Sequence, residues 1–287
     1  MAVLQQNFSQ SVSDTPSHCT ATETAASATA PRGIAGDVWE YRDERGELFR
    51  IHLATTRSLR ERAYRLAHSV YQKRGYVPGD SDGMIVSSFD ADAHTFTLLA
   101  EDAQGRAAGT VTLAFDAGTG LPSDEIYSPE LNQLRSEGCR MSEVVRLAID
   151  EAHAHSKALL VNMFILCSVY ARRVMKYSDF VIEVNPRHVT FYKRMLSFDP
   201  AGPERRCPRV QDAPAVLLRL NLAAQEEVIG RVGGTNSYSN GRSLYAHFCS
   251  LEEELPIAAF LSRLQQPMSA EDAAYFLMRL RVVGRAA

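Results

Sequence analysis

The longest apolar segment of the chain runs from Ala158 to Ala171, between Lys157 and Arg172, and it limits what the sequence can form. It is too short to cross a bilayer, which takes about 20 residues. A helix that is apolar on every side must therefore be buried within a protein. Strand patterns stand on both sides of it, from Ser142 to Ile149 and from Phe180 to Val184, and indicate a sheet that buries the helix. We therefore expect an α/β (α+β) protein.

Composition divides the chain into four stretches. Residues 1–35 are rich in Ser, Thr and Ala and have few apolar side chains to offset the entropy of ordering, which predicts a disordered tail. Residues 36–224 alternate strand and helix patterns and form the predicted main domain. Residues 225–242 include a run of Gly, Ser and Asn that indicates a linker. Residues 243–287 have helical apolar spacing, which predicts a helical C-terminal extension that packs on the core or on a second copy of the chain.

Charge, cysteines and missing motifs exclude several classes of protein. The formal net charge is −3 and no basic stripe appears, which argues against a nucleic-acid partner. The five cysteines are scattered without a CxxC pair, and no signal-peptide or membrane-spanning pattern is found, so we expect a cytoplasmic protein with reduced thiols. His153 and His155 stand two apart with no further ligand nearby in the sequence, so no metal site is assigned.

Two charged residues, Glu143 and Arg146, interrupt the predicted central strand. In a regular strand, side chains three apart point to opposite faces. A bulge near Val144 and Val145 would bring both charges to one cleft, and bulges are common beside active sites. Two interpretations stay open at this point: a functional pair, or a buried ion pair or solvated strand-end charges without function.

Tyr192 is a second candidate, on a predicted helix that starts after Asn185 and Pro186. An aromatic side chain at helical spacing is more often part of the core than of an active site. Tyr192 is therefore either a core residue or an active-site residue.

Several segments resemble the long-chain N-acyl amino acid synthase family: Gly120 to Tyr127, Glu143 to Ile149, Val181 to Tyr192 and Cys207 to Leu218. The resemblance covers roughly Leu53 to Leu222. It implies a GNAT-like acyltransferase fold, with a mixed central sheet and helices on both faces, related to the acyl-homoserine lactone synthases. It also implies an acyl thioester co-substrate, carried by acyl carrier protein or by CoA, and no bound cofactor.

The resemblance suggests roles for several residues. The Glu-x-x-Arg strand of the lactone synthases maps onto Glu143 and Arg146, and their acidic loop residue maps onto Asp90. Glu143 would act as the general base, Arg146 would orient it or bind the acceptor carboxylate, and Tyr192 would protonate the leaving thiolate. Backbone amides at the expected bulge would hold the oxyanion. The remaining substrate-binding candidates are Val144, Val145 and Asn185.

The chain also departs from the related families. Ala67 and Tyr76 stand where the lactone synthases have Arg and Trp, which argues against lactone synthesis. The turn from Asp150 to Ser156 has no glycine where GNAT enzymes hold the CoA pyrophosphate, which favours acyl carrier protein as the donor. The predicted docking face for the carrier protein consists of Arg172, Arg173, Lys176, Arg187 and Lys193. The alternative is that these residues form a solvated basic face without function.

These inferences predict an N-acyltransferase that moves a fatty acyl group from a carrier-protein or CoA thioester to the amine of an amino acid. Two other functions stay open: an acetyl-CoA-dependent GNAT acetyltransferase, and a non-catalytic acyl-binding sensor. A homo-oligomer formed through the C-terminal helices is compatible with an enzyme and with a sensor.

Overall fold

A computed structural model describes residues 32–78, 83–235 and 243–283. Most of the predicted tail and part of the predicted linker lie outside these residues. Residues Gly33–Ala35 of the expected tail form a strand that pairs with Val38–Arg42. None of the described helices is long and apolar enough to span a membrane.

The described strands form one mixed sheet in the order β1-β2-β3-β4-β5-β6-β7-β10-β8, with β9 beside β10. Neighbouring strands are antiparallel except β6 and β7, which are parallel. The predicted mixed sheet is therefore confirmed. The strands are β1 (Gly33–Ala35), β2 (Val38–Arg42), β3 (Leu48–Leu53), β4 (Phe96–Glu101), β5 (Ala107–Phe115), β6 (Met141–Ile149), β7 (Asp179–Val184), β8 (Asp199–Pro200), β9 (Arg205–Cys207) and β10 (Ala213–Asn221).

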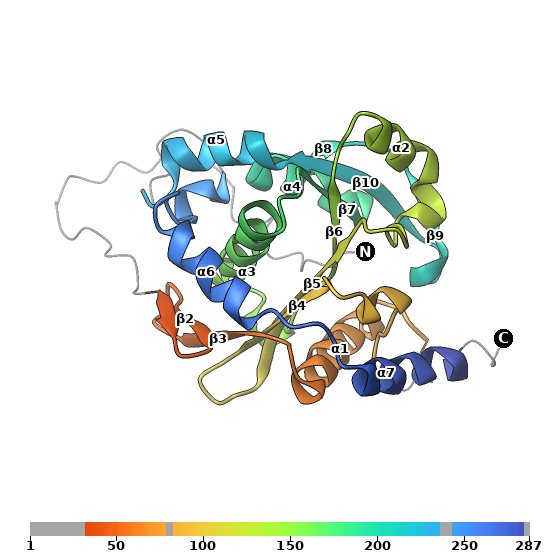
Figure 1. Cartoon of the computed structure of the whole chain (residues 1–287), viewed down its shortest axis with the longest axis horizontal. Coiled ribbons are helices and arrows are strands. Elements are labelled where there is room, and N and C mark those ends of the chain that lie inside the picture. The colour runs from red at the N-terminus through yellow and green to blue at the C-terminus, as the bar shows by residue number, and fades with distance from the viewer. Residues whose placement is uncertain (1–31, 79–82, 236–242, 284–287) are drawn as a thin grey trace, which may run out of the picture.

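Helices cover both faces of the sheet, as expected, with α1, α2 and α7 on one side and α3, α5 and α6 on the other (Figure 1). The longer helices are α1 (Arg57–Gln72), α2 (Asp124–Ser136), α3 (Lys157–Val169), α4 (Val189–Leu196), α5 (Leu222–Val232), α6 (Glu254–Leu264) and α7 (Ala270–Val283). Short helical turns are η2 (Ser88–Ala91), η3 (Glu151–His153), η4 (Tyr170–Val174), η5 (Pro186–His188), η6 (Pro208–Val210) and η7 (Leu244–His247).

Helix α3 is the buried helix that the apolar segment predicts. Every residue from Leu159 to Val169 is buried. The Ser156 hydroxyl caps the helix by accepting the backbone N–H of Leu159 at 3.2 Å, which ends the preceding turn and starts the helix at a fixed position.

The C-terminal region differs from the predicted layout. Helix α5 continues to Val232 and therefore occupies the first part of the expected linker. The predicted helices beyond residue 243 are present. The turn η7 and the helix α6 belong to the main hydrophobic cluster through Leu244, Tyr245, Ile257, Phe260 and Leu261, as does Phe248 just after η7. In α7, Phe276 packs against Tyr64 of α1. The extension thus packs on the same chain; its division from the main domain stays a prediction.

Candidate active site

Strand β6 carries a bulge at Arg146. The register between β5 and β6 shifts between Thr110 and Thr112, so that Arg146 and Leu147 together face a single residue of β5. The backbone of Arg146 has φ of 51°, in the left-handed region that only a few non-glycine residues adopt. The bulge therefore lies just beyond the predicted position at Val144 and Val145.

The bulge resets which side chains share a face. Val144 and Leu147 would lie on opposite faces of a regular strand, yet both belong to the main cluster around α3. Glu143 and Arg146 point to the other face, toward α2 and α1 respectively. They do not pair with each other, so the interpretation as a buried Glu143–Arg146 ion pair is wrong.

Glu143 is fully buried, with 0% exposure. One carboxylate oxygen accepts the backbone N–H of Ser123 at 2.8 Å and its hydroxyl at 2.6 Å. The other oxygen has no hydrogen-bond partner among the described residues. Burial and, after it, the negative charge of Glu183 raise the pKa of Glu143 to about 7, against the opposing effects of Arg209 and the Ser123 hydrogen bond. Glu143 can therefore exchange a proton near neutral pH.

A tight turn before α2 positions Ser123. The Asp124 carboxylate accepts the backbone N–H of Leu121 at 2.7 Å and pairs with Arg135 at 2.6 Å. Gly120 has φ of +77°, and a Cβ there would lie 2.7 Å from the Asp124 carboxylate. Helix α2 accordingly begins at Asp124, with a kink at Tyr127.

A second acid, Glu183 on β7, lies near Glu143 and is also fully buried. Arg209 approaches both of its carboxylate oxygens at 2.7 Å and contacts Glu125 at 2.7 Å. The arginine therefore neutralises Glu183 directly. Sequence analysis missed Glu183, Arg209 and Ser123; the signal for Glu183 was the same as for Glu143, an acid within a buried strand.

Arg146 shares this face of β6 with Glu143 but points toward α1 rather than α2. Its guanidinium makes a two-pronged contact with Asp90, one arm at 2.8 Å, and donates to the carbonyl of Ile85 at 3.0 Å. The group also lies over the rings of Tyr64 and Phe89, at 4.5 and 5.0 Å from their centres. The structure thus joins two predicted site residues, Asp90 and Arg146, in one buried pair.

The other predicted site residues have different surroundings. Tyr192 is fully buried in the main cluster, its hydroxyl has no partner among the described residues, and burial raises its pKa well above the ordinary value. Asn185 caps η5 by accepting the N–H of Arg187 at 3.3 Å. The parallel pairing of β6 with β7 is described only up to Glu143, so Val144 and Val145 lie where the two strands cease to pair.

The predicted basic docking face does not form as one surface. Arg172 is 8% exposed and, with Arg173, binds Glu254 of α6 at 2.7 and 2.9 Å. Lys176 lies just before β7, whereas Arg187 lies just after it. Six residues of strand separate these ends by roughly 20 Å.

The candidate site thus consists of a buried acid on the bulged strand of a mixed sheet that helices cover on both faces. A family model described as N-acyl amino acid synthase FeeM matches residues 62–221, which is more than half of the chain. The chain therefore belongs to the FeeM family of N-acyl amino acid synthases, and it is an enzyme that transfers an acyl group to an amine.

The chain is also similar to several solved structures. FeeM, an N-acyl amino acid synthase from uncultured soil microbes, superposes with a TM-score of 0.56 at 25% identity, over 64% of this chain and 95% of that chain. The acyl-homoserine lactone synthase LasI gives 0.47 at 17% identity, over 62% and 91% of the two chains. The CoA-dependent lactone synthase BjaI gives 0.45 at 19%, over 63% and 88%. No curated protein matched significantly.

Proposed function

We propose that the enzyme transfers a fatty acyl group from the thioester of acyl carrier protein to the α-amine of an amino acid, with Glu143 as general base. The observation that supports this most is the free carboxylate oxygen of Glu143, buried and with a pKa of about 7. A base with a pKa near the working pH is well suited to take a proton during the reaction.

In the proposed reaction, the amine nitrogen attacks the thioester carbonyl carbon and the carbon–sulfur bond breaks. Free α-amines titrate near 8 and are largely protonated at neutral pH, so a base is needed to release the nucleophile. Glu143 would accept the proton directly or through one water. Tyr192 would protonate the leaving thiolate.

The thioester carbonyl would bind where the pairing of β6 with β7 ends. Of the backbone N–H groups of Val144 and Val145, the one that points away from β5 would stabilise the oxyanion of the tetrahedral intermediate. The Asp90–Arg146 pair would act by holding the bulge in place, because both guanidinium arms are already engaged. Asn185, just after the end of β7, would contact the substrate.

Two features support a carrier-protein donor. The turn from Asp150 to Ser156 presents acids, with the Asp150 carboxylate accepting the N–H of Ala152 at 3.0 Å and Glu151 beside Lys73, and these would repel a CoA diphosphate. Positive charge surrounds His188: burial first, and then the charges of Arg187 and Arg74, lower the pKa of His188 to about 4. These arginines would receive the single phosphodiester and acidic surface of a carrier protein.

The test compares matched donors. The purified full chain is incubated with a mixture of amino acids and either acyl carrier protein or CoA bearing the same long acyl chain, at rising salt. Mass spectrometry should find an N-acyl amino acid, formed faster from the carrier-protein donor, with an advantage that shrinks as salt screens docking. Equal rates from both donors at every salt concentration would refute the carrier-protein part, and absence of any N-acyl amino acid would refute the acceptor class. A cytoplasmic location is part of the same proposal.

A further inference from the structure

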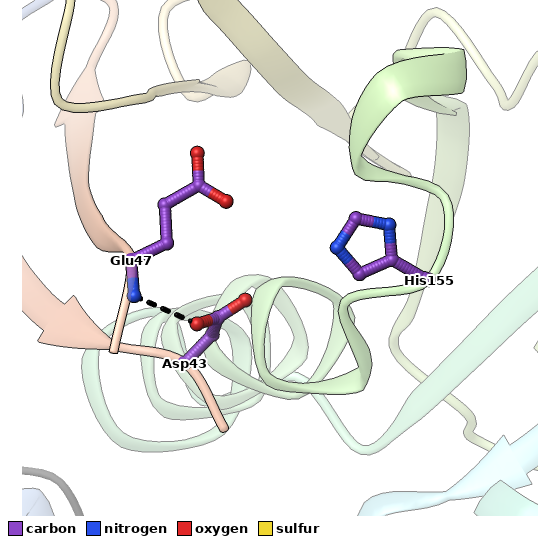
Figure 2. A group of neighbouring side chains, drawn as sticks. All are labelled: Asp43, Glu47 and His155. Atoms are coloured by element: carbon purple, nitrogen blue, oxygen red, sulfur yellow. Dashed lines mark hydrogen bonds between the residues drawn. The ribbon is translucent and has the colours of Figure 1, made fainter. Parts of the chain in front are cut away.

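Three side chains from two distant parts of the chain meet at the end of the β2–β3 hairpin (Figure 2). Asp43 and Glu47 come from the turn between β2 and β3, and His155 comes from the segment between η3 and α3. One ligand-type atom from each of the three lies within 4.8 Å of the others. We call this group the hairpin cluster.

Two atoms of the hairpin cluster are buried and unused. Asp43 is 2% exposed. Its Oδ1 accepts the backbone N–H groups of Arg45 and Glu47, each at 2.9 Å, but its Oδ2 has no partner among the described residues. The Nε2 atom of His155 is likewise buried without a partner. Figure 2 shows the unused oxygen of Asp43 on the side of His155, and a ring nitrogen of His155 directed at the two carboxylates.

The charges of the hairpin cluster are poorly balanced by protein groups. Within the described ranges, no Lys or Arg forms a salt bridge with Asp43 or Glu47; the ionic contact of Glu47 is to His153, at 3.5 Å. After burial, the charges of Asp43 and Glu47 are among those that raise the pKa of Tyr41, so the region carries a negative field. A buried carboxylate is costly unless a cation or hydrogen bonds offset its charge.

We propose that Asp43, Glu47 and His155 bind one divalent transition-metal cation, of which Zn²⁺ is the best match. Two carboxylates and one imidazole are ligands that first-row metals accept, whereas Mg²⁺ and Ca²⁺ take oxygen ligands. The remaining coordination positions would be filled by water.

Neighbouring groups support this arrangement. The Nε2 atom of His153 lies 3.5 Å from Glu47 and 3.5 Å from Asp102, so it can orient the Glu47 carboxylate from behind. The ring of His153 is held edge-on against Phe49, with centres 5.4 Å apart. The cation would link the β2–β3 turn to the segment that leads into α3.

The test uses metal binding rather than catalysis. Tag-free full-length chain is titrated with Co²⁺, which reports nitrogen and oxygen ligation by visible absorption, and then with Zn²⁺ as a competitor. We expect one saturable Co²⁺ site that Zn²⁺ displaces, and a Tm that rises with Zn²⁺ because the ion binds only the folded state.

Variants identify the ligands. Asp43→Asn keeps the Oδ1 acceptor of the turn and removes the anionic Oδ2, while His155→Gln removes the imidazole. Each should weaken Co²⁺ binding by about tenfold or more. Glu44→Gln, an exposed acid of the same turn, should leave the affinity unchanged and serves as the control.

Two results would overturn the proposal. The first is absence of saturable Co²⁺ and Zn²⁺ binding to folded wild-type chain. The second is saturable binding that Asp43→Asn and His155→Gln leave unchanged while both variants remain folded. In either case the hairpin cluster would not be a metal site.

Discussion

The carboxyl group of Glu143 combines complete burial, one free oxygen and a pKa raised to about 7. Because a base acts only when ionised, kcat should increase as pH rises through about 7 and then level off. Glu143→Gln should lower kcat by roughly 10²- to 10⁴-fold and abolish this rise. Ser123→Ala is the matched variant: it removes a hydrogen bond that lowers the pKa, so its profile should move to higher pH. A wild-type profile that is flat across this range would contradict the assignment.

Folding stability should respond to the same proton. The pKa of Glu143 is raised from 4.5 to about 7 in the folded protein, so its neutral form is favoured there. The stability it contributes is fully present below pH about 4.5 and is lost as pH rises through about 7, an effect of about 3 kcal/mol. Glu143→Gln should lack this loss when urea unfolding is followed across the range. Parallel curves for wild type and variant would exclude the shift.

Arg146 and Asp90 form a pair that is only 4% and 2% exposed. Arg146→Met would leave a buried carboxylate unpaired, which typically costs about 3–5 kcal/mol. The double variant Arg146→Met with Asp90→Asn should recover part of that loss, because the charge is removed with its partner. Urea unfolding of the four proteins in the cycle measures the coupling. Strict additivity of the two single changes would show that the pair contributes nothing to stability.

Single site residues were predictable where a charged side chain interrupts an apolar strand pattern. Glu143 and Arg146 stand out because charges are rare in a central strand. Ser123 could not be found in this way, since its role depends on a turn that brings the start of α2 beside β6. His155 was visible, but its two carboxylate neighbours come from a hairpin about a hundred residues earlier in the chain.

At the scale of elements, a bulge in β6 was predictable, because only a bulge places Glu143 and Arg146 on one face. The residue at which the bulge occurs was not predictable. The left-handed backbone falls on Arg146, not on Val144 or Val145. The strands from Ser142 to Ile149 and from Phe180 to Val184 and the buried helix between them were predicted because their apolar patterns are local. The basic residues of η4 were misjudged because their acidic partners, on α5 and α6, lie far along the chain.

These partners predict how α6 is attached. Glu254 is buried and binds both Arg172 and Arg173. Glu254→Gln should lower the Tm clearly, because it leaves the buried Arg172 with less charge compensation. Glu226→Gln is the matched control: its side chain also contacts both arginines but is 35% exposed, so its loss should matter less. Equal Tm values for wild type and Glu254→Gln would indicate that apolar packing alone attaches α6.

For the whole molecule, the separation of its basic residues predicts where a carrier protein binds. Arg187 and Lys193 are exposed beyond the C-terminal end of β7, while Lys176 is exposed before its N-terminal end. Reversal of charge by Arg187→Glu with Lys193→Glu should raise KM for acyl carrier protein and flatten its dependence on salt, because docking between opposite charges is lost. The KM for the matching acyl-CoA should change much less, since CoA brings no acidic protein surface. Lys176→Glu has the same change of charge at the other end of the strand and should leave both KM values near those of the wild type. If Lys176→Glu weakens the carrier-protein donor as much as the double variant does, the proposed docking end is wrong.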